Sequence, residues 1–234
     1  KRYPVVTTEI QQRIEKELKT IEEMDFVSFF LVNWDIISYA QRKNYFYVGR
    51  GSGANSIVAY LLRITDVDPI ELNLYFERFM NVYRTSPPDF DIDFSWRDRE
   101  DVTNYIFDRY GKNGEVSLIA TYSTYRHSAA MRELGKVFGL PKHEIDTLSD
   151  GKYDPTQLES YAKLVHQYGR LIHDFPNLRS VHASGILISE KPIHYFSATD
   201  LPPKGFPTTH FDMIIAEDAG LYKYDILGQR GLGK

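Results

Sequence analysis

The sequence predicts a folded protein of the α/β (α+β) class. Segments with apolar residues at helical spacing recur along the chain, and between them lie short runs with the period of two that is typical of β-strands. With 234 residues and 42% hydrophobic residues, the chain is long enough to bury a substantial core. That core could belong to one large domain or to two smaller ones.

The elements follow from these patterns in order. The first helix should be capped by Thr7 or Thr8, and its apolar residues Ile10, Ile14, Leu18 and Ile21 lie at helical spacing. The segment 141–179 is polar and helical, which indicates an inserted subdomain. The other predicted helices are 26–41, 57–62, 71–80, 96–110 and 128–138, and the predicted strands are 45–48, 88–94, 116–122, 181–189, 208–212 and 220–228.

Composition narrows the classes of function. The chain has no cysteine, which excludes disulfides, a thiolate metal site and a cysteine nucleophile. No apolar run approaches the length of a membrane span, and the first residues lack a signal region, so we expect a cytoplasmic protein without a membrane partner. The net charge is −4, so any contact with nucleic acid should be local rather than driven by a global basic field.

The most informative stretch is an acidic strand, Pro88–Phe94. Asp89, Asp91 and Asp93 alternate with three large apolar residues, so a strand would present three carboxylates on one face and pack the other face into a core. Carboxylates are the natural ligands of Mg²⁺ or Mn²⁺, and two such ions form the usual clamp for phosphoryl transfer. The alternative is an edge strand with a solvated acidic face.

A glycine-rich turn precedes the acidic strand. Gly49–Ser56 follows one predicted strand and leads into a predicted helix, an arrangement that suits a phosphate because backbone N–H groups and the helix N-terminus favour an anion. It is neither a Walker A loop nor a complete G-x-G-x-x-G. An ordinary glycine turn remains the alternative.

An acidic residue on the last predicted strand completes a hypothesis about the chemistry of the site. Asp225 could join Asp89 and Asp91 at two metal ions, while Arg50, Arg78 and Lys223 neutralise a triphosphate. The reaction class would be nucleotidyl transfer, and convergence of the three carboxylates in space would support it. For Arg78 the alternative is a salt bridge to Glu77 or Asp68, and for Lys223 it is a surface strand position: both alternatives stay open at this point.

Six motifs occur in the order seen in the α subunit of bacterial DNA polymerase III, the C family of DNA polymerases, and the chain resembles that family from about Ile10 to Gly228. The motifs are Gly49–Ala54, Thr65–Pro69, Phe76–Phe79, Pro88–Phe94, His182–Gly185 and Lys223–Gly228.

The resemblance implies a fold and a set of site residues. The fold would be a polymerase-beta-like nucleotidyltransferase palm, with a mixed sheet backed by helices. Asp89, Asp91 and Asp225 match the family's catalytic, metal-binding triad, which takes two Mg²⁺ ions with Mn²⁺ as a possible substitute. The nucleotide- and phosphate-binding positions are Arg50, Gly51, Ser52, Arg78 and Lys223. Asp93 lies outside the triad.

The resemblance also implies organisation and partners. Residues 1–139 and 180–234 would form the palm, and residues 140–179 would form a small inserted thumb. Primer-template DNA and dNTPs would be the substrates, and a sliding clamp and other replisome subunits would bind through regions outside this sequence. We expect a nucleoid-associated bacterial protein whose isolated 234-residue chain extends primers weakly or not at all.

Three features of the sequence depart from the family pattern. Asn55 replaces a glycine of the loop, Gln229 replaces a leucine, and the insertion is short and more like the error-prone branch. The replicative and error-prone branches therefore both remain open. Two other classes of function also remain: another two-metal enzyme, such as a small-molecule nucleotidyltransferase or a phosphodiesterase, and a non-catalytic binding module.

Overall fold

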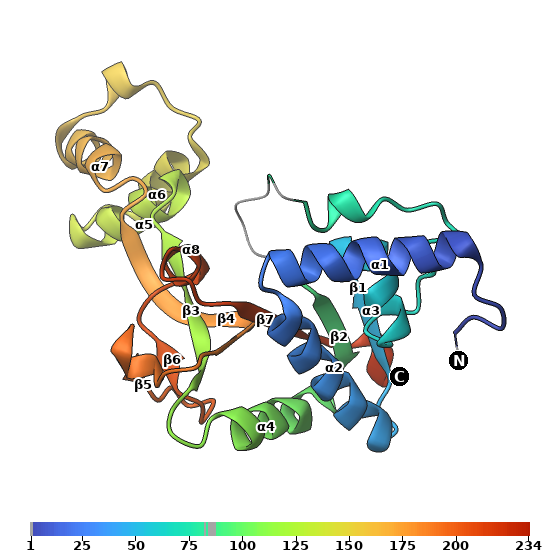
Figure 1. Cartoon of the computed structure of the whole chain (residues 1–234). Helices are drawn as coiled ribbons and strands as arrows, with labels where there is room; N and C mark the ends of the chain where they lie inside the picture. The colour runs from blue at the N-terminus through green and yellow to red at the C-terminus, as the bar shows by residue number, and fades with distance from the viewer. Residues whose placement is uncertain (1, 82, 84–87) are drawn as a thin grey trace. The chain divides into compact units, whose positions relative to one another are not determined.

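The structure is a computed structural model that describes residues 2–81, 83 and 88–234. A seven-stranded mixed sheet has the order β1-β2-β7-β4-β3-β6-β5 and is backed by helices (Figure 1), which confirms the predicted α/β class. Strand β2 runs antiparallel to β1 and parallel to β7, and β7 runs antiparallel to β4. The strands are β1 (Tyr47–Arg50), β2 (Asp91–Ser95), β3 (Val116–Thr124), β4 (Pro176–Ile188), β5 (Thr199–Asp200), β6 (Thr208–Thr209) and β7 (Lys223–Gln229).

Most predicted helices are present with small shifts of their ends. Thr7 caps the first helix, since its side chain accepts a hydrogen bond from the N–H of Ile10 at 3.3 Å. None of the helices in the described part of the chain combines the length and the apolar character that a membrane crossing requires. The α-helices are α1 (Thr8–Glu23), α2 (Val27–Arg42), α3 (Ile57–Leu61), α4 (Arg99–Tyr110), α5 (His127–Val137), α6 (Lys142–Asp150), α7 (Ser160–Leu171) and α8 (Met213–Asp218).

The helix predicted over 71–80 is wrong. Asp68 accepts hydrogen bonds from the N–H groups of Ile70 and Glu71, at 2.9 and 3.3 Å, and closes a turn. Asn73 then adopts the left-handed region with φ 50°, which ends that turn. Only a short 3₁₀ helix follows, Phe76–Arg78.

The apolar face of the acidic strand lies in the core, as the alternation predicts. Phe90, Ile92 and Phe94 are at most 3% exposed. Helix α2 covers this face: the ring of Phe29 stacks on that of Phe90 at 5.5 Å and lies 5.1 Å from that of Tyr224 on β7. Burial of these side chains fixes the register of β2 and turns its acidic residues to the opposite face.

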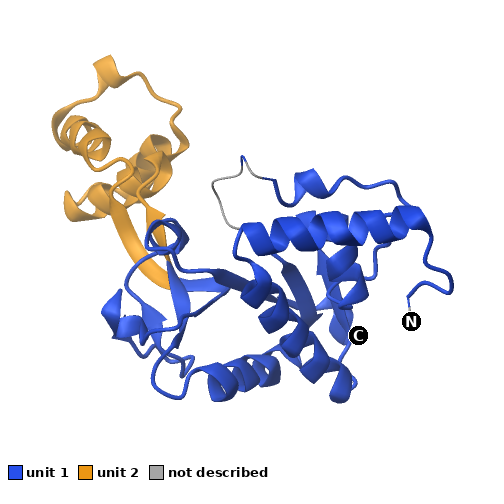
Figure 2. Cartoon of the chain, viewed as in Figure 1, with its two compact units in different colours: residues 1–120, 181–234 blue, residues 121–180 orange. Residues whose placement is uncertain are grey.

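The chain forms two compact units (Figure 2). The first comprises Lys1–Ala120 and Val181–Lys234, and the second comprises Thr121–Ser180. In the second unit α5 packs against α6 and α7, because Gly135 allows close approach of Ile145. This unit contains the predicted insertion 140–179 and also α5, which the sequence assigned to the segment 1–139.

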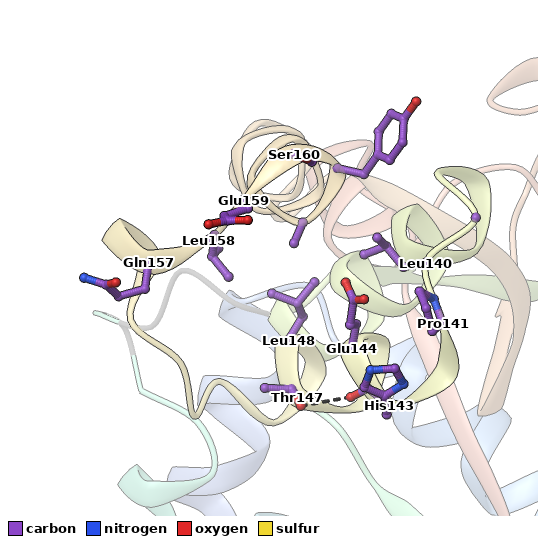
Figure 3. A pocket seen from close by; sticks show the side chains of 13 residues that line it. Leu140, Pro141, His143, Glu144, Thr147, Leu148, Gln157, Leu158, Glu159 and Ser160 are labelled. Carbon is purple, nitrogen blue, oxygen red and sulfur yellow. Dashed lines mark hydrogen bonds between the residues drawn. The ribbon is translucent and has the colours of Figure 1, made fainter.

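The second unit contains a cavity of about 610 Å³ (Figure 3). Its walls come from the start of α6 and from the segment that leads into α7, with Glu144 and Glu159 among them. No lysine or arginine lines it among the described residues. Because two carboxylates and no permanent cation face this space, the cavity does not suit a phosphate group.

Candidate metal centre

The register of four neighbouring strands places functional residues in one row. Arg50 on β1 pairs with Asp91 on β2, Asp91 pairs with Asp225 on β7, and Asp225 pairs with Gly185 on β4. Residues directly opposite each other project from the same face of a sheet. Sheet register therefore brings together two acids from distant parts of the sequence.

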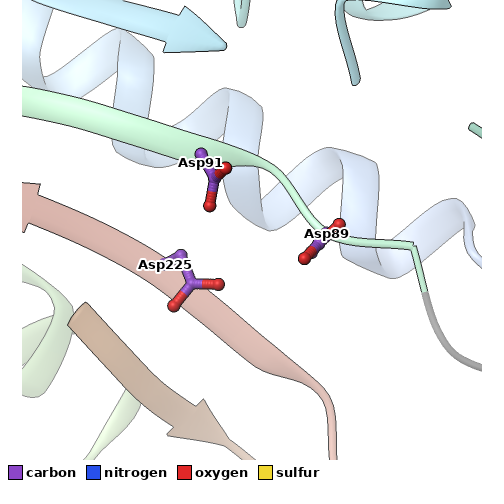
Figure 4. A group of neighbouring side chains, drawn as sticks. All are labelled: Asp89, Asp91 and Asp225. Carbon is purple, nitrogen blue, oxygen red and sulfur yellow. The ribbon is translucent and has the colours of Figure 1, made fainter. Parts of the chain in front are cut away.

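Asp89, Asp91 and Asp225 form the cluster shown in Figure 4. Each offers one carboxylate oxygen, and these oxygens all lie within 4.8 Å of one another. Asp91 is the first residue of β2, whereas Asp89 lies just before that strand, which begins three residues later than the predicted strand 88–94. Asp225 is buried and the other two are half-buried. Three carboxylate oxygens this close together can hold a divalent cation.

The local electrostatics also favour a cation. Burial raises the pKa of Asp91, the negative charges of Asp225 and Asp89 raise it further, and Arg50 partly offsets these effects. A cation between the carboxylates would relieve this repulsion. Because the donors are three carboxylates without a thiolate, the set fits a hard ion such as Mg²⁺ or Mn²⁺.

Asp225 is held on both of its oxygens. Lys223, two residues earlier on β7, forms an ion pair with Oδ2, and the hydroxyl of Ser184 donates to Oδ1 at 2.6 Å. The Lys223 side chain is only 13% exposed, so the alternative of a solvated surface lysine does not apply. Ser184 is a contact that the sequence interpretation missed, although its motif was recognised.

Asp93 differs from the other two acids of its strand. Its Oδ2 accepts from Arg50 Nε at 2.7 Å, and its Oδ1 accepts from Gln229 Nε2 at 3.3 Å. Arg50 also donates from Nη1 to Asp91 at 3.0 Å, so its guanidinium bridges the two acids. Gln229, which departs from the family pattern, thus contributes to the environment of Asp93. With a donor on each oxygen, Asp93 serves to hold Arg50.

The glycine-rich loop lies beside Asp91. Gly51 has φ +80°, and a Cβ at this position would stand 3.0 Å from Asp91 Oδ2, so a side chain is disfavoured by both conformation and space. Ser52 is half-buried, and its carbonyl accepts from the side chain of Asn55 at 2.8 Å. Asn55, the residue that departs from the family pattern, therefore closes the loop from within.

The helix after this loop does not offer its N-terminus to a phosphate, contrary to the sequence-based expectation. The carboxylate of Glu17 accepts from the Ser56 hydroxyl at 2.8 Å and from the N–H of Val58 at 3.3 Å, so it already occupies the start of α3. Arg13 pairs with Glu17 at 2.6 Å and donates to the carbonyl of Asn55 at 2.9 Å. Glu17 and Arg13 hold the loop in place, and the helical periodicity of α1 gave no sign of this role.

Arg78 takes no part in the contacts described above. It is exposed at the end of the 3₁₀ helix Phe76–Arg78. Neither predicted salt-bridge partner is bound to it, since Glu77 pairs with Lys16 and Asp68 accepts from the Tyr3 hydroxyl at 2.7 Å. Within the described residues, the charge of Arg78 is therefore not paired with either acid.

Comparison with known proteins identifies the family. The model of the bacterial DNA polymerase III alpha NTPase domain matches residues 1–228. The chain belongs to this family. The predicted resemblance to the DNA polymerase III α subunit is thereby confirmed.

Several curated DNA polymerases are between 35% and 40% identical to the chain over the region that aligns with it. The DNA polymerase III subunit alpha of Treponema pallidum is 40% identical over 99% of the chain, and that of Bacillus subtilis is 38% identical over 94%. The error-prone DNA polymerase of Symbiobacterium thermophilum is 35% identical over 98% of the chain. The chain spans 21%, 21% and 23% of the lengths of these three relatives. Since both kinds of polymerase lie at similar identity, the comparison does not separate the replicative from the error-prone branch.

Proposed function

We propose that this chain is the catalytic palm of a DNA-directed DNA polymerase, which transfers a nucleotide from a dNTP to a primer 3′-hydroxyl. The observation that carries the proposal is the convergence of Asp89, Asp91 and Asp225. Membership of the DNA polymerase III family supports the same reaction. The residues that surround the cluster supply the charges and donors that such a transfer needs.

The three carboxylates would hold two Mg²⁺ ions, or Mn²⁺ in their place. When bound, the ions would activate the primer hydroxyl as a nucleophile and stabilise the charge that develops on the transferred phosphate. Asp91 and Asp225 would hold the ions from facing positions on β2 and β7. Asp89, just before β2, completes the cluster from the side of the acidic strand.

The remaining site residues would bind the nucleotide. Gly51 and Ser52 would donate backbone N–H groups to phosphate oxygens. The start of α3 would take no part, because Glu17 already occupies it. Arg50 is held by Asp93 yet remains 44% exposed, so it can neutralise a phosphate while it keeps its orientation. Lys223 would neutralise charge beside Asp225. The exposed Arg78 is assigned to the triphosphate through the family motif alone.

The two units would divide the work of the palm and the thumb. The sheet of the first unit would correspond to a polymerase-beta-like palm, and the helices of the second unit would grip primer-template DNA. The sliding clamp and other replisome subunits would bind elsewhere in the longer protein, which would act in the bacterial cytoplasm at the nucleoid. The family's two branches, replicative and error-prone, are equally compatible with these contacts.

The test is DNA synthesis by the full-length protein that carries this chain. Asp91→Asn and Asp225→Asn keep the size of each side chain but remove its charge, and each should lower primer extension at least about 100-fold. Asp108→Asn, at an exposed site on α4, is the matched control and should keep activity. Full activity of both site variants, with the fold intact by circular dichroism, would leave the acidic cluster as a feature of a non-catalytic binding module.

A further inference from the structure

The motif His182–Gly185 on β4 lies against Asp225 and has no part in the proposal above. Ser184 and Asp225 are both buried, at 6% and 4% exposure, and the hydroxyl–carboxylate hydrogen bond between them is 2.6 Å long. We propose that Ser184 is a positioning residue that orients Asp225 for a divalent cation, and that His182 holds Ser184 in place. This inference rests on the proposed metal centre.

The histidine organises the backbone of its own motif. Nδ1 of His182 accepts a hydrogen bond from the N–H of Gly185 at 2.9 Å, and the N–H of Ser184 points to the same nitrogen at 3.4 Å. A nitrogen that accepts carries no proton, so the ring bears its hydrogen on Nε2. The ring of His182 thus holds the backbone of β4 in place at Ser184, whose hydroxyl donates to Asp225.

Gly185 makes this close approach possible. A Cβ at this position would lie 3.0 Å from His182 Nδ1 and 2.8 Å from Ile119 Cδ1, and both distances are too short for an unaltered structure. Gly185 also pairs directly with Asp225 across β4 and β7. Histidine, serine and glycine at this spacing therefore all act on the position of one carboxylate.

The orientation of Asp225 depends on a balance of two partners. Lys223 forms an ion pair with Oδ2, while the hydroxyl of Ser184 donates a hydrogen bond to Oδ1. An ionised carboxylate has about four lone-pair positions, so these two partners leave room for a cation. Without the hydroxyl, the carboxylate is free to turn toward the ammonium group of Lys223 and away from Asp91. Partners of metal ligands typically change metal affinity by about 10–100-fold.

The experiment measures Mn²⁺ binding to the 234-residue chain by electron paramagnetic resonance, with isothermal titration calorimetry as a second readout. Ser184→Ala should weaken Mn²⁺ binding by about tenfold. Ser184→Thr retains the hydroxyl and should bind within about threefold of the unaltered chain. The control is Ser117→Ala, since Ser117 is fully buried but donates to the backbone carbonyls of Leu118 and Pro207, at 3.0 Å each. This variant should bind Mn²⁺ as the unaltered chain does.

A double-mutant cycle distinguishes positioning from a general loss of structure. In the Asp225→Ala background, Ser184→Ala should have no further effect on Mn²⁺ binding, because the carboxylate on which it acts is absent. Equal affinity of the unaltered chain and Ser184→Ala, or an undiminished effect in the double variant, would overturn the inference while the metal centre stands. If the unaltered chain binds no Mn²⁺, the metal centre itself is refuted and the positioning role falls with it.

Discussion

Asp91 and Asp225 face each other directly across the parallel strands β2 and β7, and each has a cationic partner of its own. Arg50 approaches Asp91 from β1, on one side of the pair, while Lys223 lies beside Asp225 on β7. These partners offset part of the repulsion between the two carboxylates. The pair is therefore held in place by the register of the two strands.

The first prediction concerns the 234-residue chain by itself. It should fold, bind Mn²⁺ weakly and extend a primer poorly or not at all, because it spans only about a fifth of the length of its curated relatives. The measurement is extension of a labelled primer by the purified chain, compared with the full-length protein at equal concentration. Robust extension by the chain alone would contradict this prediction.

The second prediction concerns the buried ion pair that anchors the glycine-rich loop. Glu17 is fully buried, and burial raises its pKa although Arg13 and Ser56 lower it. Glu17→Ala would leave Arg13 without its buried partner and should reduce the free energy of unfolding by about 3 kcal/mol. Urea denaturation measures this change.

Glu15→Ala is the control for that experiment, because Glu15 lies on the same helix and is exposed. It should alter stability by less than about 0.5 kcal/mol. An equal effect of the two substitutions would show that the Glu17 network contributes nothing special to the fold.

Local patterns were enough to predict several parts of this structure. The alternation in Pro88–Phe94 correctly placed three apolar residues in the core. In an extended segment with one buried face, every second side chain points to that face. The spacing of the apolar residues correctly predicted α1, with Thr7, one of the two candidates, as its cap, although Leu18 of that set is 49% exposed. The predicted helix over 71–80 failed because Asn73 adopts the left-handed region, with φ 50°, and ends the turn that Asp68 begins.

Contacts between distant segments could not be predicted from these patterns. Asp89, Asp91 and Asp93 are equivalent in an alternating strand, and the contact with Gln229 distinguishes the last of them, whereas Arg50 contacts both Asp91 and Asp93. The role of Glu17 was hidden because a glutamate on a helix is normally solvated. In each case the deciding partner comes from another strand or helix, and no spacing rule within one segment encodes it.

The third prediction concerns the pH dependence of stability. The hydroxyl of Tyr39 on α2 donates to Asp101 on α4 at 2.6 Å. This hydrogen bond lowers the pKa of Asp101 from 3.8, and it raises the pKa of Tyr39 from 10.0 to about 12. Tyr39→Phe should therefore reduce stability most between pH 3.8 and 10.0.

The sign at each end follows from linkage. The contribution of Asp101 is present above 3.8 and is lost as the pH falls through its lower folded-state pKa, while that of Tyr39 is lost as the pH rises from 10.0 toward about 12. Thermal melts of both proteins across this range measure the difference. Tyr195→Phe, at an exposed ring, should show none. A constant difference at every pH would refute the linkage.

The last prediction separates conformation from space at the glycine-rich loop. Gly51 and Gly114 both have positive φ, +80° and +88°, so alanine at either position should cost about 1 kcal/mol of stability. Only at Gly51 would the new Cβ meet Asp91, at 3.0 Å from Oδ2, whereas nothing lies within 4 Å at Gly114. Gly51→Ala should therefore also displace the Asp91 carboxylate from the cluster and weaken Mn²⁺ binding about tenfold.

Gly114→Ala should lose a similar amount of stability but bind Mn²⁺ normally. The comparison needs thermal melts and Mn²⁺ titrations on the same preparations. Equal loss of Mn²⁺ affinity in both variants would mean that the loop acts only through general stability. A selective loss in Gly51→Ala would show instead that glycine is required at this position because a Cβ would displace the Asp91 carboxylate.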